Sequence, residues 1–137
     1  MREVVPNLVW IGNAGDLRDV KSVLARGIEA VVDLAAEEPA VQYPRDAVYC
    51  RIPLVDSTGN APSMLRLAIE TTSRLIQSRV PALVACGGGM SRSPAIVAAA
   101  LARVEGVTLE EALGRIAAVG PHDPSPGLLA DIQGLFS

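Results

Sequence analysis

The stretch ALVACGGGMSRSPAIVAAALA, residues 82–102, joins an apolar run to an apolar helical pattern through three consecutive glycines. Residues 82–86 are apolar throughout, which is typical of a strand that is covered on both faces of a sheet. A helix should follow from about Ser91 to Val104, because Pro94 is tolerated in a first helical turn. A strand, a glycine-rich loop and a helix in this order predict an α/β fold, in which ligands bind at the carboxyl ends of the strands.

Three other segments carry strand patterns, at residues 7–12, 28–34 and 47–55. The last of them is followed by DSTGNAP, residues 56–62, which has the composition of a loop. Strands that alternate with helical patterns favour parallel pairing. The sequence therefore predicts an α/β fold with a mostly parallel central sheet flanked by helices, in which the glycine-rich loop connects a buried strand to a helix.

The helical segments can be placed from their apolar periodicity and their capping residues. We expect Asp16 to cap the first helix, which should bury Leu17, Val20 and Leu24 and end at Gly27. Further helices are predicted at residues 62–79, at residues 108–120 behind a capping box of Thr108 and Glu111, and at residues 125–136.

Length and composition limit the classes of function. A chain of this length can bury its own core, so we expect residues 1–137 to form a single domain. A net charge of −3 and 3% aromatic residues supply neither the basic surface nor the stacking platforms that nucleic-acid binding uses. The longest apolar run, residues 95–102, is far shorter than the roughly 20 residues of a membrane span, so we expect no membrane association. Two cysteines and an N-terminus without a secretory pattern predict a reducing, cytoplasmic location.

The glycine-rich loop has the composition of an anion-binding site. Glycines permit close backbone approach and positive φ, so the N–H groups of such a loop can surround a small anion. The N-terminus of the following helix adds partial positive charge at the same point. Arg92, which five residues separate from Cys86, can hold two oxygens of a tetrahedral oxyanion. These surroundings also favour a thiolate, so Cys86 is the candidate nucleophile.

The segment ACGGGMSRSP resembles the signature loop of the cysteine-dependent protein phosphatases in their dual-specificity form, within the protein tyrosine phosphatase superfamily. The family pattern is His, Cys, two residues, Gly, two residues, Arg, then Ser or Thr, and it is matched by Cys86, Gly89, Arg92 and Ser93. The segments NLVWIGNAGD and GIEAVVDL are similar to the opening strands of the family, and VYCRIPLVDSTGN to the strand and loop that carry its general acid. Ala85 departs from the pattern, because the family has histidine there.

The resemblance implies a phosphoester hydrolase that acts on phosphotyrosine, phosphoserine or phosphothreonine of proteins, or on small phosphoesters. Cys86 would attack phosphorus and form a phosphocysteine, Asp56 would be the general acid, and Ser93 would assist departure of the thiolate. The phosphate would be bound by the backbone amides and the guanidinium of the loop, which are those of Gly87, Gly88, Gly89, Met90, Ser91 and Arg92.

Cleavage of a phosphoester also requires on chemical grounds an acid that protonates the leaving oxygen. Asp56 is the first candidate, because it follows a predicted strand and lies in a glycine-containing loop that can close over a substrate. Asp33 and Asp123 are the alternatives. Asp33 ends its strand at the same edge of the sheet, whereas Asp123 lies in an Asp-Pro pair similar to the acid of the low-molecular-weight phosphatases, in which the order of acid and cysteine is opposite.

Two other functions remain open. A rhodanese-type sulfurtransferase also has a cysteine at the head of an anion-binding loop after a parallel strand, although its loop is usually one residue shorter and it needs no acid like Asp56. A phosphate-binding module with little or no catalysis is the second alternative, and Ala85 favours it.

Several residues also have structural interpretations. Ser93 can simply cap the helix, and Cys50 is expected to pack in the core, with a reversible disulfide to Cys86 as the alternative. His122 lies in a Gly-Pro turn and is interpreted as a surface residue. One histidine and two separated cysteines do not make a ligand set, so we expect no metal ion and no cofactor.

Overall fold

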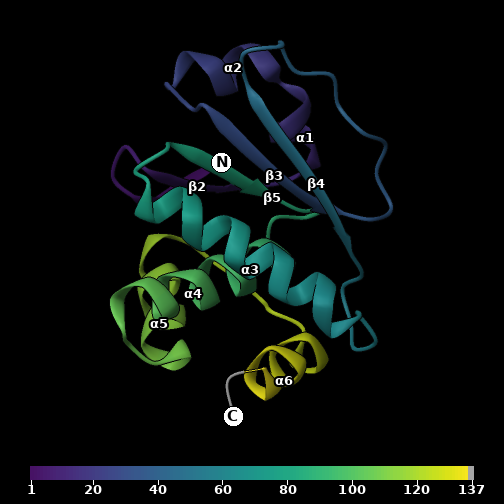
Figure 1. Cartoon of the computed structure of the whole chain (residues 1–137), viewed down its shortest axis with the longest axis vertical. Coiled ribbons are helices and arrows are strands. Elements are labelled where there is room, and N and C mark those ends of the chain that lie inside the picture. The colour runs from purple at the N-terminus through teal and green to yellow at the C-terminus, as the bar shows by residue number, and fades with distance from the viewer. Residues whose placement is uncertain (136–137) are drawn as a thin grey trace.

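A sheet of five strands forms the centre of the structure, a computed structural model that describes residues 1–135 (Figure 1). The strands are Arg2–Val5 (β1), Val9–Gly12 (β2), Ala30–Ala35 (β3), Val48–Leu54 (β4) and Ala82–Ala85 (β5). Their order in space is β1-β2-β5-β3-β4. β1 runs antiparallel to β2, and the other three pairs are parallel. The mostly parallel sheet that the sequence predicts is therefore confirmed.

Helices lie on both sides of this sheet (Figure 1). One side carries α1 (Ala14–Arg18) and α2 (Val20–Ala25). The other side carries α3 (Pro62–Gln77), α4 (Arg92–Glu105), α5 (Leu109–Val119) and α6 (Pro126–Gly134). Among residues 1–135, no helix has the length and apolar character needed to cross a membrane.

Alternate side chains of the central strand divide the core into two clusters. In β5, Leu83 and Ala85 pack with the apolar residues of α1 and α2. Val84 and the following Cys86 instead join the larger cluster beneath the other four helices. All four residues of β5 are buried because the strand has a neighbour on each edge and helices on each face. This position explains the uninterrupted apolar run of the sequence.

Helix α4 is buried along most of its length. Residues 92–101 are all buried, and the helix packs against α3, α5, α6 and the strands β2 and β5. Ala95, Ala98 and Ala99 are fully buried, and their small side chains allow neighbouring elements to approach closely. The stretch from β5 to α4 therefore occupies the middle of the molecule, with its glycine-rich loop at the carboxyl edge of the sheet.

The first helical segment differs from its prediction. The N-cap of α1 is Asn13 rather than the predicted Asp16, which lies within the first turn and completes a capping box with Asn13. Asp19 then interrupts the helix and caps α2, where its carboxylate accepts the N–H of Ser22. A side chain that can bind backbone N–H groups locally competes with the continuous helix, so two short helices replace the predicted one.

This interruption changes which apolar side chains are buried. Leu17 is buried as predicted, but Val23 is fully buried, whereas Leu24 is 38% exposed. Gly27 follows the segment with φ of 81°, so its predicted role at the end of the helix is confirmed.

Strand β1 is missing from the sequence prediction. It has four residues, lies at the edge of the sheet and pairs with β2 alone. Pro6 and Asn7 follow it, and Asn7 turns the chain with φ of 57°. A short edge strand is covered on few sides, so its sequence carries little of the pattern that identifies buried strands.

The later helices lie close to their predicted bounds. The Thr108 hydroxyl accepts the N–H of Glu111 at 3.0 Å and caps α5, which Gly120 ends. Helix α6 follows its N-cap Ser125 and ends at Gly134. The prediction extended this last helix to Phe136, which lies outside the described residues.

The burial of α4 leads to a prediction for stability. Ile96 is fully buried in the larger cluster, so Ile96→Ala should lower the free energy of unfolding by about 2–5 kcal/mol, through lost burial and the cavity that remains. The control is Leu67→Ala, because Leu67 is 48% exposed, and it should change the free energy by about 0.5 kcal/mol or less. Urea denaturation measures both, and equal losses in the two variants would contradict the central position of α4.

Candidate active site

The loop between β5 and α4 is held from outside by three hydrogen bonds to its carbonyl oxygens. In a trans peptide, the carbonyl oxygen and the N–H of the next residue point in opposite directions. The N–H groups of residues 88, 90 and 91 therefore point away from these outside donors, as an anion-binding loop requires. The donors are the N–H of Ala14 to Gly87 at 3.1 Å, the N–H of Asp123 to Met90 at 2.6 Å, and the guanidinium of Arg2 to Gly89 at 3.3 Å.

Two of the three loop glycines meet a specific steric requirement. Gly89 has φ of 73°, and a Cβ at this position would lie 3.0 Å from the carbonyl carbon and oxygen of Gly12. A side chain at Gly87 would overlap the carboxylate of Glu37. Gly88 is exposed, and a Cβ there would meet no atom within 4 Å among the described residues. Close packing against protein atoms thus explains the first two glycines but not the third.

The Cys86 sulfur lies inside this loop and receives several hydrogen-bond donors. The residue is 2% exposed. The N–H of Gly89 donates to Sγ at 3.2 Å, and the N–H of Ser93 donates at 3.5 Å. The Ser93 hydroxyl lies 3.1 Å from Sγ and can donate to a thiolate. Because Ser93 belongs to the first turn of α4, the sulfur also lies at the positive end of that helix dipole.

Arg92 is buried beside the loop and forms hydrogen bonds through both terminal nitrogens. Nη1 donates to Oε1 of Glu37 at 2.6 Å and to the carbonyl oxygen of Leu54 at 2.8 Å. Nη2 donates to Oε2 of Glu37 at 2.6 Å. Within residues 1–135, the buried Nε has no acceptor. A guanidinium has five N–H groups, so Nε and the second N–H of Nη2 form one edge that is left for two oxygens of an oxyanion.

Glu37 is part of the candidate site that sequence reasoning missed. Its side chain is 53% exposed, but its carboxylate makes two hydrogen bonds to Arg92. The hydrogen bonds from Arg92 lower the pKa of Glu37 from 4.5 to about 2, and the same hydrogen bonds raise the pKa of Arg92. A signal existed in the sequence, because Glu37 follows a buried strand at the edge of the sheet where ligands bind.

Asp56 reaches the loop through Ser91. The Ser91 hydroxyl donates to Oδ1 of Asp56 at 2.5 Å, and the oxygen of the Ser91 hydroxyl accepts the N–H of Ser125 at 2.7 Å. Ser91 was a candidate for its backbone amide alone, so the contact of its side chain with the candidate acid is new. The structure thus brings Cys86, Arg92 and Ser93 together in the loop and joins Asp56 to them through one hydroxyl.

The two alternative acids, Asp33 and Asp123, differ in burial and in their contacts with the loop. Asp33 is fully buried, and its carboxylate accepts the Tyr49 hydroxyl at 2.5 Å and the N–H of Ala35 at 3.2 Å. Burial and the hydrogen bond to Asp33 raise the pKa of Tyr49. These contacts give Asp33 a structural role within the sheet. Asp123 is exposed and contacts the loop through its backbone N–H.

The remaining candidates lie outside the loop. Cys50 is half-buried in β4, and both it and Cys86 are free thiols. His122 is half-buried rather than on the open surface, and its Nε2 lies 3.3 Å from the carbonyl oxygen of Leu113. Ala85 lies in the apolar cluster beneath α1 and α2, on the face of the sheet opposite to Cys86. Among residues 1–135, no three histidine, cysteine, aspartate or glutamate side chains are grouped as metal ligands would be.

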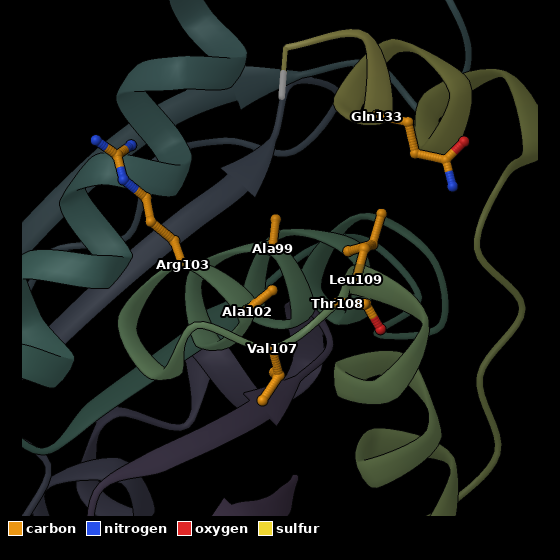
Figure 2. A pocket seen from close by; sticks show the side chains of 7 residues that line it. All are labelled: Ala99, Ala102, Arg103, Val107, Thr108, Leu109 and Gln133. Carbon is orange, nitrogen blue, oxygen red and sulfur yellow. The ribbon is translucent and has the colours of Figure 1, made fainter. Parts of the chain in front are cut away.

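A separate pocket lies where α4, the start of α5 and α6 meet (Figure 2). Its volume is about 280 Å³, and its walls are mostly apolar. The residues that line it are Ala99, Ala102, Arg103, Val107, Thr108, Leu109 and Gln133. None of them belongs to the glycine-rich loop, so this pocket is distinct from the candidate active site.

The ion pair of Glu37 leads to a prediction for the pH dependence of stability. A carboxyl whose pKa is lower in the folded state contributes stability above its unfolded pKa, and this contribution disappears as the pH falls through the folded pKa. The stability that the Glu37 carboxylate contributes should therefore be lost as the pH falls from 4.5 to about 2. Glu37→Gln should destabilise the protein at neutral pH, and its difference from the wild type should shrink below about pH 4.5. Denaturant unfolding at several pH values measures this, and a difference that is independent of pH would contradict the prediction.

The chain was also compared with known proteins. No protein-family model and no curated protein matches its sequence. Among solved structures, human DUSP28 is similar with a TM-score of 0.85 and 23% identity, over 98% of this chain and 94% of that chain. A mouse protein described as a dual specificity phosphatase, in complex with zinc tungstate, is similar with a TM-score of 0.85 and 25% identity, over 98% of this chain and 84% of that chain.

A third structure is the human tyrosine phosphatase-like serine/threonine/tyrosine-interacting protein, with a TM-score of 0.83 and 18% identity over 98% of this chain and 93% of that chain. In each case the likeness covers almost all of this chain, including the sheet and the elements that carry the loop. The chain therefore has the fold of the dual specificity phosphatases, as the resemblance of its signature loop implied.

Proposed function

We propose that the chain is a phosphoester hydrolase of the dual-specificity type, with Cys86 as its nucleophile. The observation that supports this most directly is the pairing of two features in one loop. The sulfur of Cys86 has hydrogen-bond donors around it, and Arg92 next to it keeps a two-donor edge that Glu37 and Leu54 do not use. A tetrahedral oxyanion that lies against this edge and the loop amides would be within reach of the sulfur.

The first chemical step is a transfer of the phosphoryl group to sulfur. The Cys86 thiolate forms an S–P bond while the bond between phosphorus and the ester oxygen breaks. Asp56 gives its proton to the leaving oxygen, so an alcohol or phenol departs rather than its anion. The loop amides and Arg92 stabilise the negative charge that is spread over the three remaining phosphoryl oxygens.

The second step releases phosphate. Water attacks phosphorus, the S–P bond breaks, and the proton of the water passes to Asp56, which restores the acid for the next cycle. The Ser93 hydroxyl, 3.1 Å from Sγ, can donate to the thiolate as it leaves. The cycle balances with water as its only co-reactant, because one ester is converted into an alcohol and inorganic phosphate.

The loop favours substrates with a simple phosphate monoester. Apart from Arg92, its residues Gly87 to Ser91 carry no charge, so they offer no additional binding to a second phosphate group. The similar mouse protein was obtained as a complex with zinc tungstate, and tungstate is a tetrahedral oxyanion like phosphate. We propose phosphorylated protein side chains and small phosphoesters as the substrate class.

A phosphate-binding module with little catalysis is the second candidate. Ala85 favours it, because this chain lacks the histidine that precedes the cysteine in the family pattern. Release of nitrophenol from para-nitrophenyl phosphate, measured beside transfer of sulfur from thiosulfate to cyanide, separates the candidates. Turnover of the first substrate alone supports the phosphatase, turnover of the second supports a sulfurtransferase, and tungstate binding without either activity supports the module.

The role of Cys86 can be tested by substitution. Cys86→Ser should abolish hydrolysis of para-nitrophenyl phosphate, because a serine hydroxyl in this loop is far less nucleophilic than a thiolate. Binding of tungstate should stay within about tenfold of the wild type, since the loop amides and Arg92 remain. Cys50→Ser is the matched control and should keep full turnover. Hydrolysis by the Cys86→Ser variant at the wild-type rate would refute the mechanism.

The role of Asp56 is tested by varying the leaving group. Asp56→Asn should lower kcat/KM for alkyl phosphates by roughly 100-fold or more, because an alkoxide cannot leave without a proton. For activated aryl phosphates, kcat/KM should fall much less, since their leaving oxygens are weak bases. Asp123→Asn is the matched control and should follow the wild type across the series. A loss that is the same for every leaving group would mean that Asp56 is not the acid.

A further inference from the structure

A carboxylate of helix α6 contacts the loop that carries Asp56, residues 55–61. The hydroxyl of Thr58 donates to Oδ2 of Asp131 at 2.9 Å, and the N–H of Gly59 donates to the same oxygen at 3.3 Å. Hydrogen bonds to a charged acceptor are roughly twice as strong as those between neutral groups. Asp131 therefore links the two elements at a point two residues beyond Asp56.

The same face of α6 packs closely against the loop. A Cβ at Gly127 would lie 3.1 Å from the backbone nitrogen of Thr58 and 3.3 Å from its Cβ, so glycine permits this approach. Gly127 and Asp131 are four residues apart and share one face of the helix. Leu128 and Ile132, which each follow one of these residues, are fully buried, so the adjacent side of the helix is fixed in the core. Asp131 is thus attached to a rigid support.

A second contact connects the beginning of α6 with Asp56 itself. The N–H of the N-cap residue Ser125 donates to the Ser91 hydroxyl, and this hydroxyl donates to Asp56. Within the loop, the side chain of Asn60 closes the turn by hydrogen bonds to the N–H of Val55 at 2.8 Å and to its carbonyl oxygen at 2.9 Å. Helix α6 therefore contacts the loop directly at residues 58 and 59, and its N-cap Ser125 is connected to Asp56 through the Ser91 hydroxyl.

We infer that Asp131 is a positioning residue, which fixes the Asp56 loop to α6 through Thr58 and Gly59 and so sets the position of the candidate acid. This inference rests on the proposed function, because Asp56 needs a position only if it transfers a proton. Asp131 itself lies on α6 and contacts the loop rather than the sulfur or Arg92. Its effect on a reaction should therefore depend on how much that reaction needs Asp56.

The activity test compares Asp131→Ala with the wild type across a series of aryl and alkyl phosphates. Asp131→Ala should lower kcat/KM roughly tenfold for poor leaving groups and less than about twofold for activated ones, because a displaced acid affects the reactions that need the proton. In the Asp56→Asn background, Asp131→Ala should have no further effect. An equal loss for all leaving groups, or an additional loss in the Asp56→Asn background, would overturn the inference.

Three further variants guard against a general loss of folding. Thr58→Val removes the hydroxyl and should reproduce part of the selective loss, whereas Thr58→Ser keeps the donor and should retain the activity that Thr58→Val loses. Glu110→Ala, which removes an exposed negative charge from α5, should behave as the wild type. Selective loss in Glu110→Ala equal to that in Asp131→Ala would attribute the effect to net charge and overturn the inference.

Hydrogen–deuterium exchange tests the attachment without any assay of activity. Peptides that cover residues 55–61 should exchange faster in Asp131→Ala than in the wild type, while peptides of β5 should be unchanged. Unchanged exchange in the loop would overturn the inference even in an active enzyme. Faster exchange in a protein without phosphatase activity would support the attachment and refute the proposed function alone, so the two failures are distinguishable.

Discussion

The ion pair of Arg92 with Glu37 is the interaction on which the arrangement of the candidate site depends. The Arg92 residue is 5% exposed and begins the buried helix α4, where the helix dipole is also positive. A buried charge is strongly unfavourable unless it is paired and hydrogen-bonded. Glu37 and the carbonyl oxygen of Leu54 meet this requirement from the ends of β3 and β4. One guanidinium thus ties together the carboxyl ends of three neighbouring strands.

The pairing of Arg92 is incomplete, and this gives the site its chemical character. Glu37 neutralises the terminal edge of the guanidinium, while the side edge with Nε keeps its donors. The loop amides and the N-terminus of α4 add partial positive charge. The free edge of Arg92 and the loop amides are the donors that the proposed phosphate would use. The N–H of Gly89 and the hydroxyl of Ser93 lie within hydrogen-bond distance of the Cys86 sulfur.

Steric requirements of the loop reinforce this arrangement. Gly89 packs on the backbone of Gly12 at the end of β2, and Gly87 leaves room for the Glu37 carboxylate. The loop carbonyls are bound by donors from β1, from the start of α1 and from the segment before α6. Four separate parts of the chain therefore contact one short loop: β1, the junction of β2 and α1, the segment after β3 and the segment before α6. Helix α6 also contacts the loop of Asp56.

The sequence by itself determined the features that arise from local patterns. The central strand, the glycine-rich loop and α4 were predictable, because burial on all sides produces an uninterrupted apolar run and because Cys86, Gly89, Arg92 and Ser93 follow one another at fixed spacing. The mostly parallel sheet followed from the alternation of strands and helices.

Contacts between distant segments were decided by the tertiary structure alone. Glu37 pairs with Arg92 across 55 residues, and Asp131 reaches Thr58 across 73. Neither pair has a local pattern, because any exposed carboxylate in a polar segment carries the same sequence signal. The break of the first helix at Asp19 was also not predictable from the sequence. The apolar periodicity of the sequence continues through Asp19, although this residue is the N-cap of a new helix. Spacing along the chain can predict which groups share a loop, but which carboxylate meets a buried cation depends on how the strand ends are brought together in space.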